Sequence, residues 1–263
     1  MYVFLCIVSF ISVFPLYWMV SAATNKSVDV TRGRLIPGTY LIENFKNLVN
    51  SQNIGRALGN SFKYAVILTL VSLVICSLAG YGFEIFHDKG KDIVMNIILL
   101  AMMVPFVATL IPLFQMFSKA GWLNSTIGFI LPTLSTPFLI MMFRQSARSF
   151  PHDIIEAARI DGANTWQEII YVYIPALGSV HKSLLMLGII GSLQTYALIG
   201  VMTGGGPNHA TEMPGTYIFM KGFTESQMGY ACAISVAVLI FALVLTFIQV
   251  RFLGSGDFMK KGE

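Results

Sequence analysis

Six long apolar stretches alternate with shorter polar connections along the 263 residues of the chain. A helix needs about 20 consecutive, mostly apolar residues to cross the hydrocarbon core of a membrane. Each stretch has roughly that length, so the pattern predicts six transmembrane helices. They cover residues 2–22, 62–83, 93–117, 125–143, 183–202 and 229–250. We therefore expect an all-α, polytopic membrane protein that forms a single transmembrane domain over residues 1–263.

The composition agrees with this prediction. The chain is 55% hydrophobic and only 11% charged, whereas about 25% of the residues of a soluble domain are charged. The net charge is +4, but no cluster of basic and aromatic residues accompanies it, so we expect no nucleic-acid partner. Cys6, Cys76 and Cys232 all lie inside predicted spans and are interpreted as small buried hydrophobic residues.

The first apolar stretch allows two interpretations. Val20-Ser21-Ala22 resembles the small-residue cleavage site of a signal peptide. However, no positively charged segment precedes the stretch, and it is longer than the ~7–15 apolar residues of a signal peptide. We favour a retained first span, in which Tyr17 and Trp18 take an interfacial position.

The charges of the connections do not orient the chain. Cytoplasmic loops of membrane proteins usually carry an excess of Lys and Arg. Here the two alternating sets of connections hold nearly equal numbers, because the long first connection, residues 23–57, contributes several of these residues itself.

One polar segment between the fourth and fifth stretches, residues 148–175, has boundaries that turn chemistry defines. Pro151 suits the first turn of a helix, and Glu156 places negative charge near the helix N-terminus. Gly162 readily adopts the left-handed conformation that ends helices. The pattern therefore predicts a short helix over residues 151–160.

A second helix is predicted after this turn. Asn164 with Gln167, or Thr165 with Glu168, supplies a capping box for its start. Pro175 is expected to end it, because a proline ring interrupts the interior of a helix.

These residues carry a family resemblance. Glu156-Ala157-Ala158, Asp161-Gly162-Ala163 and Ile174-Pro175 stand in the order and spacing of the EAA loop of ABC-importer membrane subunits. The segment is most similar to that of the sugar-importer permeases of the maltose-transporter type. Weaker similarities extend over nearly the whole chain, at Asn60-Ser61, Gly204-Gly205-Gly206-Pro207 and Gly229-Tyr230.

The resemblance implies a permease subunit of an ATP-driven, binding-protein-dependent importer of a sugar, here expected to be an oligosaccharide. It implies four kinds of partner: a second homologous permease, a dimer of cytoplasmic ABC ATPases, an extracellular or periplasmic solute-binding protein, and membrane lipid. The chain itself would bind no cofactor, since ATP and Mg²⁺ belong to the ATPase. The location implied is the bacterial cytoplasmic (inner) membrane, with both termini, including the tail 251–263, in the cytoplasm.

The resemblance also assigns roles to residues. Segment 148–175 becomes a cytoplasmic coupling loop, and residues 23–57 an extracellular loop. Contact with the ATPase is implied for Glu156, Ala157, Ala158, Arg159, Asp161, Gly162, Ala163 and Pro175. Contact with the binding protein is expected at the exposed, uncharged loop Gly204, Gly205, Gly206, Pro207 and Asn208.

Missing motifs narrow the mechanism. The cores of the six predicted spans contain no Asp, Glu, Lys, Arg or His, although ion-coupled carriers usually need such groups. Sodium coupling through backbone carbonyls remains open, so a secondary carrier is the alternative function. The chain has no G-x-x-x-x-G-K-[ST] phosphate loop, and neither H-E-x-x-H nor G-x-S-x-G. We therefore expect a transporter subunit without catalytic residues or a metal site.

The fifth stretch carries the most polar face, with Ser192, Gln194, Thr195 and Tyr196. Polar groups in a span either bond across a helix interface or line a wet cavity. Gln194 and Tyr196 would lie about 200° apart on a helix. We predict that Gln194 lines the substrate pathway, while Ser192 and Tyr196 share the packed face; helix packing throughout is the alternative.

Overall fold

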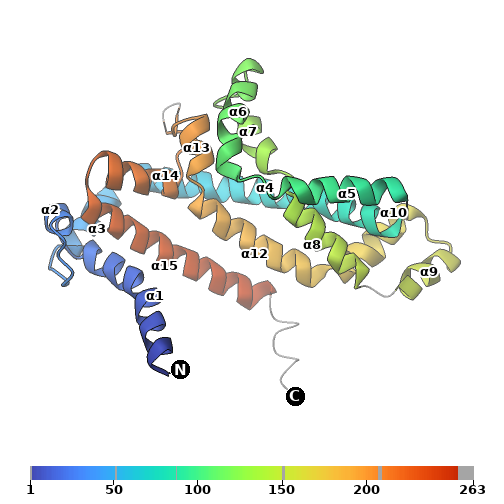
Figure 1. The fold of residues 1–263 in the computed structure, drawn as a ribbon, viewed down its shortest axis with the longest axis horizontal. Coiled ribbons are helices and arrows are strands. Elements are labelled where there is room, and N and C mark those ends of the chain that lie inside the picture. The colour runs from blue at the N-terminus through green and yellow to red at the C-terminus, as the bar shows by residue number, and fades with distance from the viewer. Residues whose placement is uncertain (1, 51, 87, 150–151, 207–208, 254–263) are drawn as a thin grey trace. The chain divides into compact units, whose positions relative to one another are not determined.

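The computed structural model describes residues 2–50, 52–86, 88–149, 152–206 and 209–253, and every regular element among them is a helix (Figure 1). Up to residue 133 the elements are α1 (Tyr2–Ala23), α2 (Ser27–Thr31), α3 (Leu41–Asn50), α4 (Gln52–Ile85), α5 (Lys89–Ala101), α6 (Phe106–Lys119), α7 (Thr126–Ile130) and the 3₁₀ helix η1 (Leu131–Thr133). They continue with α8 (Pro137–Arg148), α9 (His152–Ile160), α10 (Thr165–Gln167), the π-helix η2 (Glu168–Tyr173), α11 (Ile174–Ala176), α12 (Gly178–Gln194), α13 (Ala197–Met202), α14 (Pro214–Phe219), the π-helix η3 (Met220–Thr224) and α15 (Met228–Leu253).

Three of these helices are long and apolar enough to cross a membrane without a break: Tyr2–Ala23, Ile54–Ile85 and Met228–Arg251. Three further apolar segments are bent pairs. They are Gly90–Ala101 with Phe106–Lys119 (101°), Thr126–Thr133 with Pro137–Arg148 (48°), and Thr165–Ala176 with Val180–Gln194 (71°). Counting each bent pair as one span gives six among the described residues, which agrees with the predicted number.

Prolines account for two of the bends. Pro105 immediately precedes α6, and Pro137 is the first residue of α8. A proline has no N–H to donate, and it moves the residue before it out of the helical conformation. Both prolines lie inside the predicted third and fourth spans, where the sequence predicts kinked helices, and the structure bends at both places.

The predicted fifth span is wrong in its boundaries. Residues 183–202 were expected to form one helix, but α12 begins at Gly178 and ends at Gln194, and α13 follows as a separate helix. Between them Tyr196 has φ −128° and ψ −55°, outside the helical region. Its ring stacks on Phe219 at a centroid distance of 4.2 Å. Ser192 and Tyr196 therefore do not share one helix face.

The chain forms two compact units, each built from two separate stretches. The first unit comprises residues 1–62 and 192–248, and the second comprises 63–191 and 249–263. The prediction of a single transmembrane domain stays a prediction.

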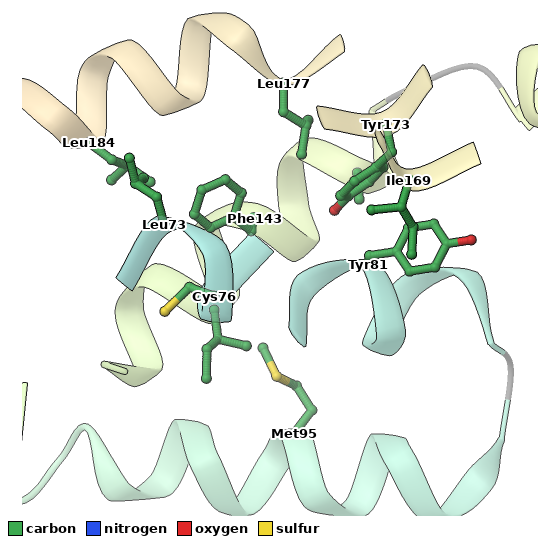
Figure 2. Packing of buried hydrophobic residues seen from close by; sticks show 11 residues of the cluster. Leu73, Cys76, Tyr81, Met95, Phe143, Ile169, Tyr173, Leu177 and Leu184 are labelled. Carbon is green, nitrogen blue, oxygen red and sulfur yellow. The ribbon is translucent and has the colours of Figure 1, made fainter. Parts of the chain in front are cut away.

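In the second unit, a buried cluster joins α4 to the coupling loop and to α8 and α12. Figure 2 shows Tyr81 of α4 beside Ile169 and Tyr173 of η2, and the Tyr81 and Tyr173 rings meet edge to face at 4.8 Å. At Gly80, a Cβ atom would lie 2.6 Å from Cβ of Phe143 in α8. This contact requires glycine, and it lets the two helices approach closely.

In the first unit, the start of α15 packs against the residues that follow α1. A Cβ at Gly229 would lie 2.5 Å from the carbonyl oxygen of Asn25. Asn44 of α3 is buried, and its Nδ2 donates to the carbonyls of Ala23 (2.9 Å) and Asn25 (3.2 Å). These bonds order the long first connection, in which the sequence predicts a turn at Pro37-Gly38 and an amphipathic helix around Ile42–Asn50; α3 confirms the helix.

Candidate functional site: the coupling loop

Helix α9 ends in a hydrogen-bonded turn centred on Gly162. This glycine has φ +87°, a conformation that a residue with a Cβ atom adopts only at a cost. Ala163 donates its N–H to the carbonyl of Ala158 (2.9 Å), and Gly162 donates to that of Arg159 (3.1 Å). This pair of bonds is the Schellman motif. The predicted turn at Gly162 is confirmed, while Pro151 lies outside the described residues.

The second helix of the loop begins with one of the two predicted capping boxes. Asn164 Oδ1 accepts from the N–H of Gln167, and Gln167 Oε1 accepts from the N–H of Asn164, both at 2.9 Å. The alternative box, Thr165 with Glu168, does not form, because the Glu168 side chain points into the protein interior instead.

The prediction that Pro175 ends this helix is wrong. The chain remains helical through η2 and α11, and it leaves the helical conformation only at Leu177, with φ −87° and ψ 15°. Pro175 stands in the first turn of α11, where a helix needs no N–H from it. The preceding turns are π-helical, so the local hydrogen-bonding pattern is not the α-helical one that the prediction assumed.

Glu168 carries the main electrostatic feature of the loop. Its side chain is only 2% exposed, whereas that of Arg159 is 50% exposed. Arg159 donates from Nε to Glu168 Oε2 (2.9 Å) and from Nη2 to Oε1 (3.1 Å), and the Tyr81 hydroxyl also donates to Oε1. The hydrogen bonds with Glu168 are the largest cause of a raised Arg159 pKa. A buried carboxylate with these three donors is satisfied rather than stranded.

This network was missed by the sequence analysis. Arg159 was assigned to the ATPase contact, and the structure gives it a partner within the chain. The signal was weak: Glu168 appeared only as an alternative capping residue, and nothing in the local pattern pairs it with Tyr81, 87 positions earlier.

The outward side of the coupling loop is exposed and partly apolar. Glu156, Ala157, Asp161, Gly162 and Pro175 are exposed, while Ala158 and Ala163 are half-buried. Large apolar side chains are exposed beside them, namely Ile154, Ile160, Trp166, Ile170 and Tyr171. Apolar surface next to charge is typical of a protein-binding patch. Within the described residues, Glu156 takes part in no ion pair.

A second ion-pair group lies at the end of α4 in the same unit. Arg144 of α8 binds Glu84 (Nε to Oε2, 3.3 Å) and Asp92 of α5 (Nη2 to Oδ1, 3.0 Å). The Glu84 side chain is 10% exposed, so one arginine neutralises a largely buried carboxylate and links three helices.

Gln194, the residue predicted to line the pathway, is the last residue of α12 and is exposed, whereas Ser192 is buried. Ser61 of α4 donates its hydroxyl to the carbonyl of Ser192 at 3.4 Å. Gly215 of α14 packs against the break after Gln194, where an added Cβ would lie 3.0 Å from the Thr195 carbonyl oxygen. The role of Gln194 stays a prediction.

The glycine-rich loop after α13 is held at both ends. Gly204 and Gly205 have φ +60° and +90°. The Thr203 and Thr211 hydroxyls are 2.7 Å apart, and Asn60 of α4 donates from Nδ2 to the carbonyls of His209 (3.2 Å) and Glu212 (2.9 Å). Gly206 belongs to the described part of the loop, whereas Pro207 and Asn208 lie outside it.

Among the described residues, no group of three or more His, Cys, Asp or Glu side chains is placed to hold a metal ion.

A sequence profile of known families matches residues 72–253, a range that includes the whole coupling loop. The chain belongs to this family, the binding-protein-dependent transport system inner membrane components.

Individual relatives are also named as permease proteins of transport systems. The lactose transport system permease protein LacG of Rhizobium radiobacter is 38% identical over 182 residues, covering 69% of this chain and 67% of the relative. The arabinooligosaccharides transport system permease protein AraQ of Halalkalibacterium halodurans is 28% identical, covering 72% and 68%. The sn-glycerol-3-phosphate transport system permease protein UgpE of Escherichia coli K12 is 31% identical, covering 57% of each chain.

Two solved structures share the fold. A chain of a bacterial ABC transporter that imports the acidic polysaccharide alginate superimposes with a TM-score of 0.74 at 20% identity, covering 98% of this chain and 94% of that one. A second structure, the alginate transporter in complex with a pentasaccharide-bound periplasmic protein, gives 0.71 at 18% identity, with coverages of 95% and 91%.

The chain is thus a multi-pass inner-membrane permease subunit of an ABC importer. It is a transport component and not an enzyme, since ATP hydrolysis in such systems belongs to a separate chain. These comparisons favour the importer over the secondary carrier.

Proposed function

We propose that the chain forms half of the membrane pore of an importer whose substrate is a sugar, specifically an oligosaccharide. The relatives named for lactose and arabinooligosaccharide transport support this substrate class. The observation that carries the transport function is the coupling loop itself, an exposed helix–turn–helix attached through a buried carboxylate to the long helix α4.

The second half of the pore is a homologous permease, and a dimer of cytoplasmic ABC ATPases drives the cycle. The exposed face of α9 docks on the ATPase, where Glu156 pairs with a basic residue. A carboxylate that only favours its own helix N-terminus contributes about 0.3–1 kcal/mol. Truncating one partner of a desolvated interfacial charge pair costs about 2–5 kcal/mol, so mutagenesis distinguishes the two roles.

The internal network gives this docking a mechanical consequence. Movement of α9 reaches Glu168 through Arg159, and Glu168 in turn bonds to Tyr81 on α4. A displacement of the docked helix therefore pulls on a membrane-spanning helix, rather than being absorbed by a flexible loop. Ala157, Ala158, Asp161, Gly162, Ala163 and Pro175 shape the surface and the angle of the loop.

The coupling loop then lies in the cytoplasm together with both chain termini. With six spans, the connection 23–57 and the loop 203–213 lie on the opposite, outer side. A solute-binding protein delivers the sugar there, where it contacts the loop of Gly204, Gly205, Gly206, Pro207 and Asn208. Gln194 lines the path that the sugar takes onward through the membrane.

Reconstitution tests the function. The complete complex in vesicles should take up lactose or arabinooligosaccharides only with its binding protein outside and ATP at the coupling-loop side. sn-Glycerol 3-phosphate serves as the comparison substrate. Uptake by the chain in the absence of an ATPase would support a secondary carrier instead.

A further inference from the structure

A polar cavity of about 440 Å³ opens in the first unit, apart from the coupling loop. Residues from both ends of the chain line it, including Lys26, Tyr40 and Asn47 from the first connection and Tyr217, Lys221 and Gln227 from the segment before α15. Its lining is mixed: aromatic rings, amides and ammonium groups surround the space, and none of the described lining residues is acidic.

The two lysines of the cavity, Lys26 and Lys221, differ in whether a carboxylate is paired with them. Lys221 lies 5.5 Å from the Tyr217 ring centroid, and its Nζ is 2.8 Å from both carboxylate oxygens of Glu225. Lys26 lies 5.4 Å from the Tyr40 ring centroid but forms no ion pair within the described part of the chain. Among the described residues, the cavity thus holds one cation that is paired with a carboxylate and one that is not.

Hydrogen bonds join the wall segments of the cavity to one another. Gly229 donates its N–H to the Ser27 hydroxyl at 3.2 Å, which joins residues 202 positions apart. The Tyr230 hydroxyl donates to the Asn47 carbonyl at 3.4 Å, and Asn44 ties α3 to the end of α1. An exposed ammonium group, Lys26, beside the amide side chains of this cavity matches the chemistry of a carboxylate, which accepts several charge-assisted hydrogen bonds.

From this geometry we infer that the cavity receives an acidic side chain of the solute-binding protein. This inference rests on the proposed function, in which both wall segments lie on the outer side. Tyr217 and Lys221 belong to α14 and η3, which directly follow the loop proposed to contact the binding protein. Most of the wall comes from connections rather than from span cores, and these connections include the segment that follows the loop proposed to contact the binding protein, so we assign the cavity to a side chain of that protein.

Such a contact strengthens and orients the docked binding protein. Complementary charges at an interface raise the association rate and fix the register of docking, and salt screens them. The proposed contact acts at the docking step, so it affects the concentration of binding protein that the transporter needs and leaves the maximal rate unchanged.

The test uses the complete transporter in nanodiscs and measures ATP hydrolysis as a function of binding-protein concentration at several salt concentrations. Lys26→Glu should raise the half-saturating concentration about five- to tenfold, with an unchanged maximal rate and a weaker salt dependence. Lys26→Gln should give a smaller rise in the same direction. Lys46→Glu is the matched control, because Lys46 is exposed on α3 and does not line this cavity.

A charge exchange identifies the source of the carboxylate. Asp or Glu residues on the binding-protein surface, changed to Lys one at a time, should include one that restores docking to Lys26→Glu. Equal half-saturating concentrations for Lys26→Glu and Lys46→Glu would overturn the inference. So would an effect that follows the anionic lipid content of the nanodisc and not the binding protein, since the ligand would then be a headgroup. A wild-type complex that the binding protein does not stimulate would instead refute the proposed function.

Discussion

Arg159 and Glu168 bind each other through two hydrogen bonds, of 2.9 and 3.1 Å, across the turn that separates the two helices of the coupling loop. The pair fixes the angle between these helices from within the chain, and the Tyr81 hydroxyl attaches it to α4. The loop is therefore a braced element, and the bracing residues are separate from the exposed Glu156 that is proposed to meet the ATPase.

Removing Arg159 should strand the buried carboxylate. Breaking a fully buried ion pair costs about 3–5 kcal/mol, but Arg159 is half exposed, and exposed pairs contribute much less. We expect Arg159→Ala to lower the free energy of unfolding by about 2 kcal/mol. Lysine should rescue only in part, because it lacks the planar two-point geometry.

The control for this prediction replaces both partners. Arg159→Leu with Glu168→Leu removes the charge along with its counter-charge, so the double variant should unfold at a higher temperature than Arg159→Ala. Thermal unfolding in detergent measures both. A double variant no more stable than Arg159→Ala would show that the ion pair is not what Arg159 contributes.

Tyr81→Phe tests the hydrogen bond from Tyr81 to Glu168 separately from the packing of the Tyr81 ring. The substitution keeps the ring that meets Tyr173 edge to face and removes only the hydroxyl that donates to Glu168. A hydrogen bond to a charged group contributes about 1.5–3 kcal/mol. We expect a stability loss in that range, together with reduced transport per ATP hydrolysed. A variant with wild-type stability and coupling would show that Glu168 does not transmit force to α4.

Gly162 should tolerate few replacements. Its φ of +87° penalises a residue with a Cβ by about 1–2 kcal/mol, although no atom lies within 4 Å of the position that a Cβ would occupy. Backbone strain rather than a clash is thus the cause. Gly162→Asn should be milder than Gly162→Val, because asparagine enters this region more readily. Equal transport by the two variants would contradict this order.

The sequence predicted the parts of this fold that local chemistry determines. The helix stop at Gly162 and the capping box at Asn164 follow from single residues and their neighbours, and the structure confirms both. The six apolar segments follow from hydrophobicity in the same way. Two predictions failed at Pro175 and Tyr196, where the outcome depends on hydrogen-bond patterns and packing partners rather than on local propensity.

The contacts that define the site could not be predicted, because they join distant positions. Tyr81 and Glu168 are separated by 87 residues, and Asn60 lies 149 residues before His209. One sequence shows that a carboxylate exists, but not which side chains surround it. The resemblance indicated which loop matters, and the structure shows which of its residues are exposed for a partner.

The prediction that Gln194 lines the substrate pathway rests on the exposure of its side chain in the structure, and not on its position around a helix. Single cysteines at positions 192 and 194, in a background without Cys6, Cys76 and Cys232, should react differently with a water-soluble thiol reagent during turnover. Position 194 should be modified because Gln194 is exposed, and position 192 should be spared because Ser192 is 7% exposed. Labelling of neither position, or of 192 alone, would remove Gln194 from the pathway.

The central claim is that the exposed face of α9 couples this permease to a separate ATPase, and Glu156→Ala tests it most directly. Asp153→Ala is the matched control, because it removes an exposed carboxylate from the same helix. The measurement is ATP-driven sugar uptake by the reconstituted complex, with ATPase co-purification recorded for each variant. We predict that Glu156→Ala abolishes uptake and co-purifies with less ATPase, because the substitution costs about 2–5 kcal/mol of docking free energy. The two permease subunits should stay assembled in this variant. Asp153→Ala should remain close to wild type in both measurements. Wild-type uptake and ATPase association in Glu156→Ala would contradict the account.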